Sequence, residues 1–216
     1  MATPKLFGYY RSSASYRIRI VLNLKGLSWQ YETVRLNRGE QKQAAFTALN
    51  PSGLVPVLDA GDAVVSQSAA IAEFLEERYA QPPLLPADQV GRARVREMMA
   101  VIGCDVHPLQ NLRVLNYLRD EFDADDDAVK RWIHRWIGAG LASFEALAMR
   151  HGKDGPFACG SSATLADAWL VPQLYNARRH ELDLAPYPRI LAIDAHCQAL
   201  APFRDAMPEH QPDAPA

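Results

Sequence analysis

A turn rich in hydroxyl groups, residues 9–17 (YYRSSASYR), lies between the first apolar run of the chain and a helical pattern. The first N–H groups of a helix have no partner within the helix and lie at the positive end of its dipole, so such a turn favours an anion such as a thiolate. Ser12 and Ser13 add hydroxyl donors at the same point. N-capping by a serine explains the same residues and is the stronger interpretation on local sequence alone.

Two further segments carry groups suited to a peptide-like ligand. Val55-Pro56 opens a predicted strand; a cis bond there would expose the N–H and C=O of Val55 to an extended peptide, although most X-Pro bonds are trans. Gln67 and Ser68 begin a second helix, where an amide, a hydroxyl and the helix dipole would hold a carboxylate. Capping explains Ser68 equally well.

The composition excludes several other classes of protein. Lys+Arg number 23 against 25 Asp+Glu, a net charge of -2, so a nucleic-acid binder acting through bulk basic charge is excluded. Cys104, Cys159 and Cys197 form no CxxC pair, which excludes a dithiol redox centre and a zinc knuckle. No apolar run approaches the ~20 residues that span a bilayer, and we expect a cytoplasmic protein. The acidic segment 120–127 is interpreted as a solvated loop rather than a metal site.

The elements that must position these groups fall into two parts of the chain. In the first part, β-rich runs predict four strands and helical spacing of apolar residues predicts two helices. The expected strands are 5–10, 29–34, 54–59 and 63–66, and the expected helices run from Ser15 to Gly26 and through 71–79. Arg17, Arg19 and Lys25 fall outside the apolar face of the first helix. This order predicts one α/β domain over residues 1–81, followed by a proline-rich linker at 82–89.

The second part, residues 90–216, is expected to be all helical because no strand pattern survives after the linker. The expected helices are 90–104, 108–120 and one of about five turns through 129–147. His107-Pro108 separates the first two, since Pro fits a first helical turn. Thr164-Leu-Ala-Asp167 is typical of a capping box, and the tail from Pro208 is expected to be loosely ordered.

In combination these motifs resemble the soluble glutathione transferase family, with its thioredoxin-like N-terminal domain, linker and all-helical C-terminal domain. Within that family the chain is similar to the zeta class, which includes maleylacetoacetate isomerase and maleylpyruvate isomerase. The matching segments are 11–20, 48–51, 55–56, 67–68, 71–77, 107–111, 170–173, 183–188 and 211–213. One residue departs from the class pattern: Ala14 stands where the class has Cys. We expect Ala14 to be tolerated, because the reactive sulfur belongs to glutathione.

The resemblance implies that glutathione is a coenzyme of the chain. The residues it assigns to glutathione are Ser12, Ser13, Gln41, Val55, Pro56, Gln67, Ser68, His107 and Asn111. A free thiol of pKa about 8.5 is only about 3% ionised at pH 7, whereas a pKa near 6.5 gives roughly 75%. That shift needs about 2.7 kcal/mol of differential stabilisation. Hydroxyl donors at a helix N-terminus supply energies of this order.

The implied substrate is a cis-enediketo acid with two carboxylates, which is converted to its trans isomer. Because negative charge develops on the enolate oxygen, cationic groups are required beside it. Arg11 and Arg179 match class positions that contact substrate carboxylates and are, with the two serines, the expected catalytic residues. Arg113 matches an arginine seen in maleylpyruvate isomerase. A surface charge explains any one of them alone, and His107 is equally well a structural residue.

We therefore predict a glutathione-dependent cis-trans isomerase, with maleylacetoacetate to fumarylacetoacetate in tyrosine and phenylalanine catabolism as the leading reaction. The alternatives are maleylpyruvate isomerase of gentisate catabolism and a general zeta-class glutathione transferase. A non-enzymatic binding protein of the same fold is a further alternative, which the retained Ser12, Val55-Pro56 and Gln67-Ser68 disfavour. The family also implies a homodimer, with no nucleic-acid or membrane partner.

Overall fold

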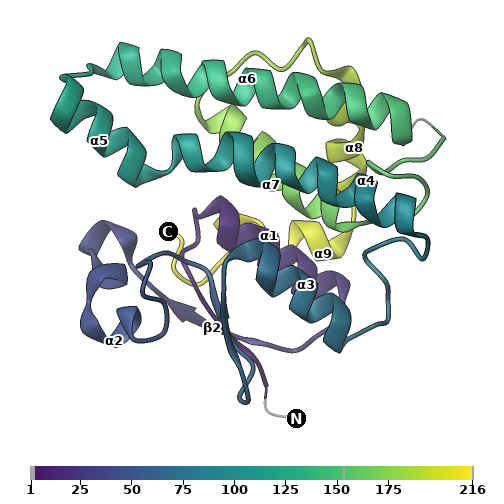
Figure 1. Ribbon diagram of the computed structural model, residues 1–216, viewed down its shortest axis with the longest axis horizontal. Coiled ribbons are helices and arrows are strands. Elements are labelled where there is room, and N and C mark those ends of the chain that lie inside the picture. Colours follow the sequence, from purple (N-terminus) through teal and green to yellow (C-terminus); the bar gives the residue numbers. More distant parts are fainter. Residues whose placement is uncertain (1–2, 153, 216) are drawn as a thin grey trace. The chain divides into compact units, whose positions relative to one another are not determined.

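The computed structural model describes residues 3–152 and 154–215, which group into two compact units (Figure 1). The first unit ends at Pro83 and also includes the chain from Ala199 onward, and the second runs from Leu84 to Gln198. The boundaries therefore differ from the expected ones, which place the whole of 90–216 in the helical domain. The reason is that the last helices pack on the first unit, where the amide of Asn23 donates to the carbonyl of Pro202 at 3.0 Å.

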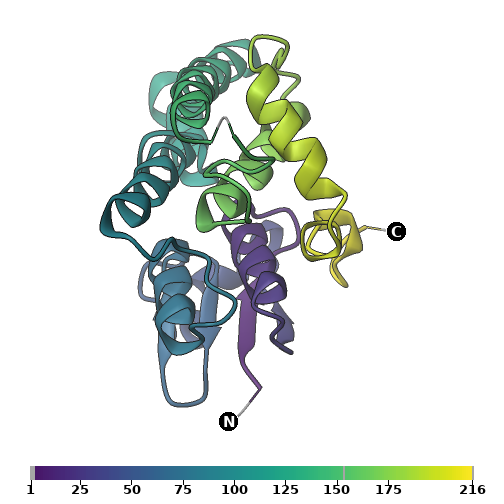
Figure 2. The same ribbon diagram turned by 90° about the vertical axis from the view of Figure 1, so that its right-hand side faces the viewer.

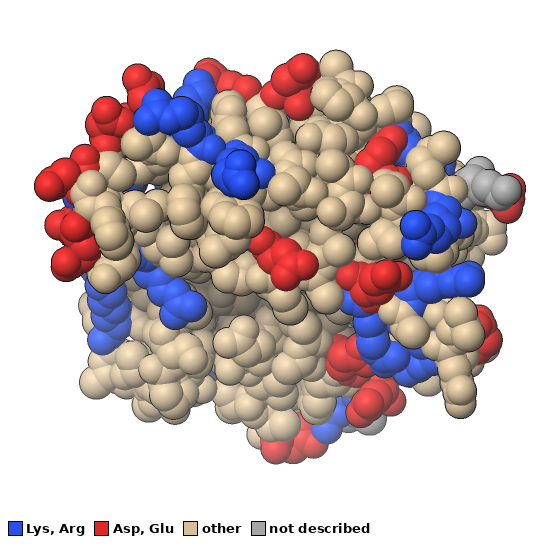
Figure 3. All heavy atoms as spheres, turned by 45° about the horizontal axis from the view of Figure 1, so that its top comes forward, with Lys and Arg blue, Asp and Glu red and all other residues tan. Residues whose placement is uncertain are grey.

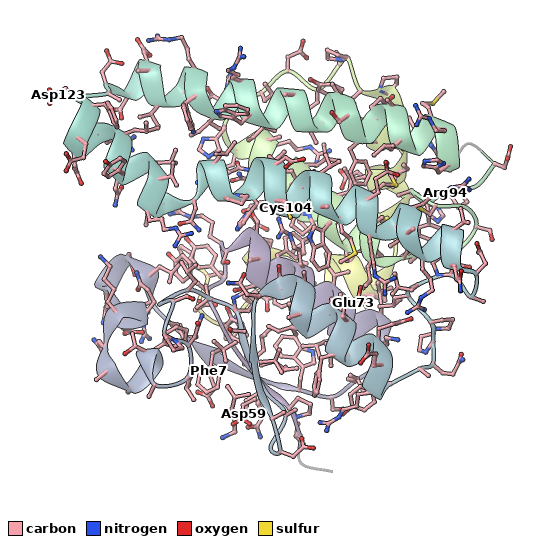
Figure 4. The ribbon with its side chains drawn as sticks, in the orientation of Figure 1. Phe7, Asp59, Glu73, Arg94, Cys104 and Asp123 are labelled. Atoms are coloured by element: carbon pink, nitrogen blue, oxygen red, sulfur yellow. The ribbon has the colours of Figure 1, made fainter. Side chains whose placement is uncertain are left out.

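The first unit is built on the expected four-stranded sheet. Its strands are β1 (Lys5–Gly8), β2 (Gln30–Thr33), β3 (Val57–Asp59) and β4 (Val64–Ser66). They lie in the order β2-β1-β3-β4, with β1 and β2 parallel and the other pairs antiparallel. In Figure 4, Phe7 marks the end of the sheet at which β1 stops, and Asp59 lies at the opposite end.

The third strand is shorter than the predicted 54–59. Pro56 has no N–H to donate to a ladder, and the carbonyl of Leu54 already accepts the side-chain amide of Asn50 at 2.7 Å. The strand therefore begins only at Val57. The hairpin to β4 forms as expected, with Ala60 N–H donating to the Ala63 carbonyl at 2.8 Å.

Two helices, α1 (Ser13–Leu24) and α3 (Ser68–Arg78), pack side by side in this unit (Figure 2). Helix α1 begins two residues before the expected Ser15, because Ser12 is its N-cap. It ends as expected at Gly26, whose φ of +65° suits glycine. Between β2 and β3 lie two short 3₁₀ turns, η1 (Leu36–Arg38) and η2 (Glu40–Lys42), and the one-turn helix α2 (Ala44–Thr47).

The cations of α1 are buried, contrary to the expected placement outside the apolar face. Arg17 is 2% exposed, Arg19 0% and Lys25 5%. Each has polar partners: the Lys25 ammonium, for example, contacts the Glu76 carboxylate at 2.5 Å and donates to the carbonyls of Tyr79 and Pro82. Helical spacing alone missed these contacts because the partners come from distant parts of the chain.

The second unit is helical, as expected. Its elements are α4 (Gln89–Ala100), the π-helical η3 (Val101–Val106), the 3₁₀ turn η4 (His107–Gln110), α5 (Leu112–Phe122), α6 (Asp126–His151), α7 (Leu165–Arg179) and α8 (Pro188–Gln198). Helix α6 has 26 residues, about seven turns rather than five. Helix α7 forms the centre of the core, with Trp169 1% exposed. No described helix combines the length and apolar character needed to cross a membrane.

The acidic segment 120–127 is solvated, as expected, but only residues 123–125 form a turn, because 120–122 end α5 and 126–127 begin α6. The carboxylate of Asp125 caps α6 by accepting the Ala128 N–H at 2.7 Å, and Asp126 pairs with Arg119 at 3.0 Å. Figure 3 shows acidic and basic side chains together at the left of the view, over this turn. Among the described residues no cluster of three potential metal ligands occurs.

The C-terminal tail is ordered, which corrects the expectation of loose order. Helix α9 (Ala201–Arg204) and the 3₁₀ turn η5 (Pro208–His210) precede Gln211, which is only 8% exposed. The Gln211 amide donates to the carbonyls of Asp205 at 3.1 Å and Met207 at 2.8 Å. These backbone contacts of one side chain hold a segment whose polar, proline-rich composition suggested disorder.

The predicted capping box at the start of α7 is confirmed. The Thr164 hydroxyl accepts the Ala166 N–H at 3.3 Å, and Asp167 accepts the Thr164 N–H at 2.8 Å. The second oxygen of Asp167 accepts the Ala158 N–H at 2.8 Å, and the carboxylate is wholly buried. Burial raises the pKa of Asp167, while these donors act in the opposite direction.

The substitution Asp167→Ala leaves two buried N–H groups without acceptors, each at a cost of about 1–3 kcal/mol. We expect the free energy of unfolding to fall by about 3 kcal/mol and Tm by roughly 6–12 °C, as measured by scanning calorimetry. The control is Asp127→Ala in the exposed first turn of α6, with an expected change below about 0.5 kcal/mol. Equal Tm values for the two variants would contradict a stabilising capping box.

Candidate functional site

The strand register brings the predicted residues of the first unit to one end of the sheet. Phe7 pairs with Val57, and Val57 pairs with Ser66. Because β1 runs antiparallel to β3 and β3 to β4, the end of β1, the start of β3 and the end of β4 meet at this edge. The segments just beyond it carry Arg11, Ser12, Ser13, Val55, Pro56, Gln67 and Ser68.

The sequence left two roles open for Ser12, capping of the helix and donation to an anion, and the geometry of its hydroxyl is compatible with both. Its hydroxyl oxygen caps α1 by accepting the Ser15 N–H at 3.2 Å. A hydroxyl carries one hydrogen besides its acceptor lone pairs, so a capping Ser12 still has a donor for a ligand. Ser13 is the first residue of α1 and is half-buried, whereas Arg11 is exposed. Ala14 lies in the same first turn and is 8% exposed.

The peptide bond before Pro56 is cis. The N–H and C=O of Val55 have no hydrogen-bond partner in the described part of the chain. Asn50 shapes the turn that leads to them, since its oxygen accepts the Ser52 N–H at 3.0 Å while its amide donates to Leu54. Gln41 lies against this turn: a side chain at Gly53 would come within 3.1 Å of the Gln41 carbonyl. The side-chain oxygen of Gln41 is buried and, among the described residues, unpaired.

The start of α3 provides a second helix N-terminus beside a cation. Gln67 precedes the helix with a φ of +70°, a conformation that L-residues rarely adopt and that is found where the surroundings impose it. Ser68 is the first helical residue, and its hydroxyl accepts from the Arg17 guanidinium at 3.3 Å. Arg17 was missed as a site residue because its helical position alone gives no sign of Ser68, 51 residues away.

In the helical unit, His107, Asn111 and Arg113 lie along η4 and the start of α5. The Asn111 oxygen caps α5 by accepting the Arg113 N–H at 3.2 Å, which leaves the amide hydrogens of Asn111 as donors. His107 is half-buried and Arg113 is exposed. The indole of Trp132 on α6 donates to the Leu109 carbonyl at 2.7 Å and fixes the turn.

Arg179, at the end of α7, is held by a chain of buried amides. Its guanidinium donates to the Asn176 oxygen at 2.6 Å, and the Asn176 amide donates to the Gln110 oxygen. The Gln110 amide donates in turn to the Gln173 oxygen at 2.9 Å. A guanidinium can only donate, so Arg179 sets the direction of every bond in the chain. Sequence reasoning missed Asn176; the segments 107–111 and 170–173 were singled out, without a role for Gln110 or Gln173.

The chain's own thiols do not provide a nucleophile at the β1–α1 turn. Burial raises the pKa of Cys159 to about 12 and also raises that of Cys197, because an ionised thiolate loses its hydration. Cys104 is exposed but lies on η3 in the helical unit. A reactive sulfur at Ser12 has to come from a ligand.

The groups in the first unit fit the tripeptide glutathione. The unpaired N–H and C=O of Val55 suit an extended peptide, and the buried oxygen of Gln41 suits an amine or amide donor. The N-terminus of α3 suits a carboxylate, and that of α1 suits a thiolate. Four recognition elements thus match four different parts of one ligand.

Comparison with known sequences agrees with this chemistry. Residues 11–78 match the family described as glutathione S-transferase, N-terminal domain. A maleylpyruvate isomerase from a Ralstonia species is 50% identical over 210 residues, covering 97% of this chain and 99% of the relative. A maleylacetoacetate isomerase from Pseudomonas aeruginosa is 48% identical over 216 residues, covering 98% and 99% respectively.

Solved structures are equally similar. The holo structure of a maleyl pyruvate isomerase, a bacterial zeta-class glutathione S-transferase, has a TM-score of 0.95 and 50% identity, covering 98% of this chain and 100% of its own. A maleylacetoacetate isomerase from Anaeromyxobacter dehalogenans with bound glutathione has a TM-score of 0.89 and 45% identity, covering 99% and 98%. The expected fold, a thioredoxin-like domain joined to a helical one, is confirmed.

Proposed function

Because the chain belongs to the zeta class of the glutathione transferase family, we propose that it is a glutathione-dependent cis-trans isomerase of a maleyl keto-diacid. The observation that carries the proposal is the juxtaposition at one sheet edge of the Ser12-capped N-terminus of α1 and the unpaired peptide groups of Val55. One feature fits a thiolate and the other fits the backbone of the peptide that bears it.

The residues of the first unit divide the work of binding glutathione in this proposal. Gln67 and Ser68 hold its γ-glutamyl carboxylate at the start of α3, and Val55, ahead of Pro56, pairs with its cysteinyl backbone. Ser12 and Ser13 donate to its sulfur. When bound, glutathione supplies a thiolate that adds reversibly to the conjugated double bond and so permits rotation about it. Further contacts are proposed for Gln41, His107 and Asn111.

Three arginines serve the diacid in the same proposal. Arg11 follows the β1 end of the sheet and is exposed to a ligand there. Arg179 and Arg113 belong to the helical unit, and Arg179 is preoriented by the Asn176 oxygen. Their task is to neutralise two carboxylates and the charge that develops on the carbonyl oxygen.

The leading substrate is maleylacetoacetate, which would place the enzyme in tyrosine and phenylalanine catabolism, and maleylpyruvate of gentisate catabolism is the second candidate. The presence of His107 and Arg113 favours maleylpyruvate, as does the relative at 50% identity. The relative at 48% identity favours maleylacetoacetate, so identity does not separate the two. We also propose a cytoplasmic homodimer, which a sedimentation mass of about twice 24.0 kDa would support.

The test of the function is isomerisation of maleylacetoacetate and maleylpyruvate, side by side, with and without glutathione. We expect turnover of at least one substrate and none without glutathione, and the larger kcat/KM identifies the physiological diacid. Absence of turnover of both, with glutathione still bound, would contradict the isomerase. It would leave a transferase or binding role and make Ala14 the first residue to replace with Cys.

Ser12→Ala removes a hydroxyl that stabilises a thiolate, and a hydrogen bond to a charged group is worth about 1.5–3 kcal/mol. We expect kcat to fall about 10–100-fold while the Kd of glutathione changes by less than about threefold, because other residues hold the tripeptide. The control is Ser143→Ala on α6, whose hydroxyl donates to the Ala139 carbonyl of its own helix. An unchanged kcat in Ser12→Ala would assign activation to Ser13 or to the helix N–H groups.

Arg179→Ala removes a cation that binds a substrate carboxylate, so we expect the KM of the diacid to rise about 10–100-fold. The Kd of glutathione should stay unchanged in calorimetry. Arg131→Ala, which removes an exposed arginine of α6, is the matched control and should leave KM as in the wild type. A normal KM in Arg179→Ala would remove this residue from the substrate site.

A further inference from the structure

We propose that the C-terminal segment is part of the active-site scaffold, in which Asp213 and Arg19 act as positioning residues that clamp Tyr10 and so hold the turn presenting Arg11 and Ser12. The inference deepens the proposed function by assigning a role to the closing Gln211-Pro212-Asp213. It rests on the proposed function for the contact between Ser12 and the glutathione sulfur and for the identity of the diacid.

The two peptide groups of Tyr10 are each held by a charged side chain. Its N–H donates to the Asp213 carboxylate at 2.9 Å, across 203 residues of sequence. Its carbonyl accepts from the Arg19 guanidinium at 3.0 Å. Bonds to ionised groups are roughly twice as strong as neutral ones, so both peptide groups of Tyr10 are firmly held. Arg11 and Ser12 follow it directly.

Hydrogen bonds within the turn fix the positions of its other residues relative to Tyr10. Ser12 N–H donates to the Tyr9 carbonyl at 3.0 Å, and Tyr16 N–H donates to the Ser12 carbonyl at 2.9 Å. Together with the cap from Ser12 to Ser15, these bonds make the turn one rigid piece with α1. A displacement of Tyr10 therefore moves the Ser12 hydroxyl relative to its ligand.

The clamp is anchored on its other side by the folded tail. The Arg19 guanidinium also donates to the Ala206 carbonyl at 2.9 Å, so one buried side chain joins the turn to the C-terminal segment. The bonds from the Gln211 amide to Asp205 and Met207 close the tail into a loop that delivers Asp213.

Charge complementarity explains why this cluster uses an acid and an arginine. Arg19 is fully buried, and burial lowers its pKa, while the charge of Asp213 acts in the opposite direction. Tyr31 lies in the same cluster, where burial raises its pKa, the Asp213 charge adds to that effect and the Arg19 charge opposes it. Among the described residues no ion pair joins Arg19 to Asp213; the two side chains meet through the peptide groups of Tyr10, and the charge of Asp213 favours the buried cation at longer range.

Packing does not replace the clamp. A cavity of about 360 Å³ opens beside the contact, and its lining includes Tyr9, Tyr10, Arg38, Asp213 and Pro215. Side chains bordering open space lack neighbours that would hold them by van der Waals contact. Once its hydrogen bonds are removed, Tyr10 has room to shift. Catalytic contacts lose efficiency with displacements of about 1 Å.

The test compares Asp213→Ala, Asp213→Asn and the control Asp205→Ala. Asp205 is an exposed acid of the same tail, and among the described residues its carboxylate contacts Arg204. The first readout is the pKa of glutathione bound to the full chain, from the ultraviolet absorbance of its thiolate. We expect this pKa to rise by about one unit in Asp213→Ala, with about a tenfold loss of kcat and little change in the KM of the diacid. Asp213→Asn, whose oxygen still accepts the Tyr10 N–H but carries no charge, should recover part of the loss, and its remaining difference from the wild type gives the contribution of the Asp213 charge.

A bound-glutathione pKa in Asp213→Ala equal to those of the wild type and Asp205→Ala would overturn the clamp. Should Asp213→Ala not fold, Arg19→Lys provides the same test, because a lysine retains the charge but not the fork that reaches two carbonyls. An unchanged thiolate pKa there would equally overturn it. The thiolate titration needs no diacid, so failure of the wild type to isomerise either substrate would contradict the proposed function alone.

Discussion

A helix N-terminus stabilises an anion through N–H groups that have no partner within the helix and that converge on one position. In the first unit, the Ser12 cap and the strand register together determine where this position lies for α1. Ser12 caps the helix through its oxygen, so its hydrogen remains available together with the free N–H groups. The sheet register then brings Val55 and Ser68 to the same edge. The end of β1 determines, through this register, where the start of β3 and the end of β4 lie. The three segments can therefore contact one peptide ligand together.

The buried cations of α1 show how that arrangement is held. Arg17 reaches the start of α3, Arg19 reaches the tail and the β1–α1 turn, and Lys25 reaches the end of α3. A buried charge is unfavourable unless it is paired and hydrogen-bonded, so each of these side chains tolerates few alternative positions for its partners. Two charges within α1 and one at its C-cap, Lys25, thereby join segments that are otherwise distant in sequence.

Local patterns predicted the four strands, the capping box and the residues at the sheet edge, because each depends on neighbours within a few positions. The expected break at His107-Pro108 lies instead at Asn111, since η4 occupies 107–110 and α5 begins at Leu112. The burial of Arg19 and the order of the tail could not be predicted in this way. They depend on partners such as Ala206 and Asp213, which only the folded chain brings within reach. The short third strand has local causes, Pro56 and the Asn50 amide bound to the Leu54 carbonyl, which the pattern of β-rich residues does not register. The roles of individual site residues came from the family resemblance and stay predictions.

In the helical unit, buried amides orient Arg179, the arginine proposed to bind a substrate carboxylate. Arg179 is exposed, and an exposed guanidinium loses much rotamer entropy when it binds a carboxylate. The Asn176 oxygen restricts it beforehand, and Gln110 and Gln173 prevent Asn176 from turning its amide group toward the guanidinium. Since the arginine can only donate, reversing any one amide would leave two donors or two acceptors facing each other. The charge of Arg179 thus determines which way the side-chain amides of Asn176, Gln110 and Gln173 face. These amides in turn hold the guanidinium in position.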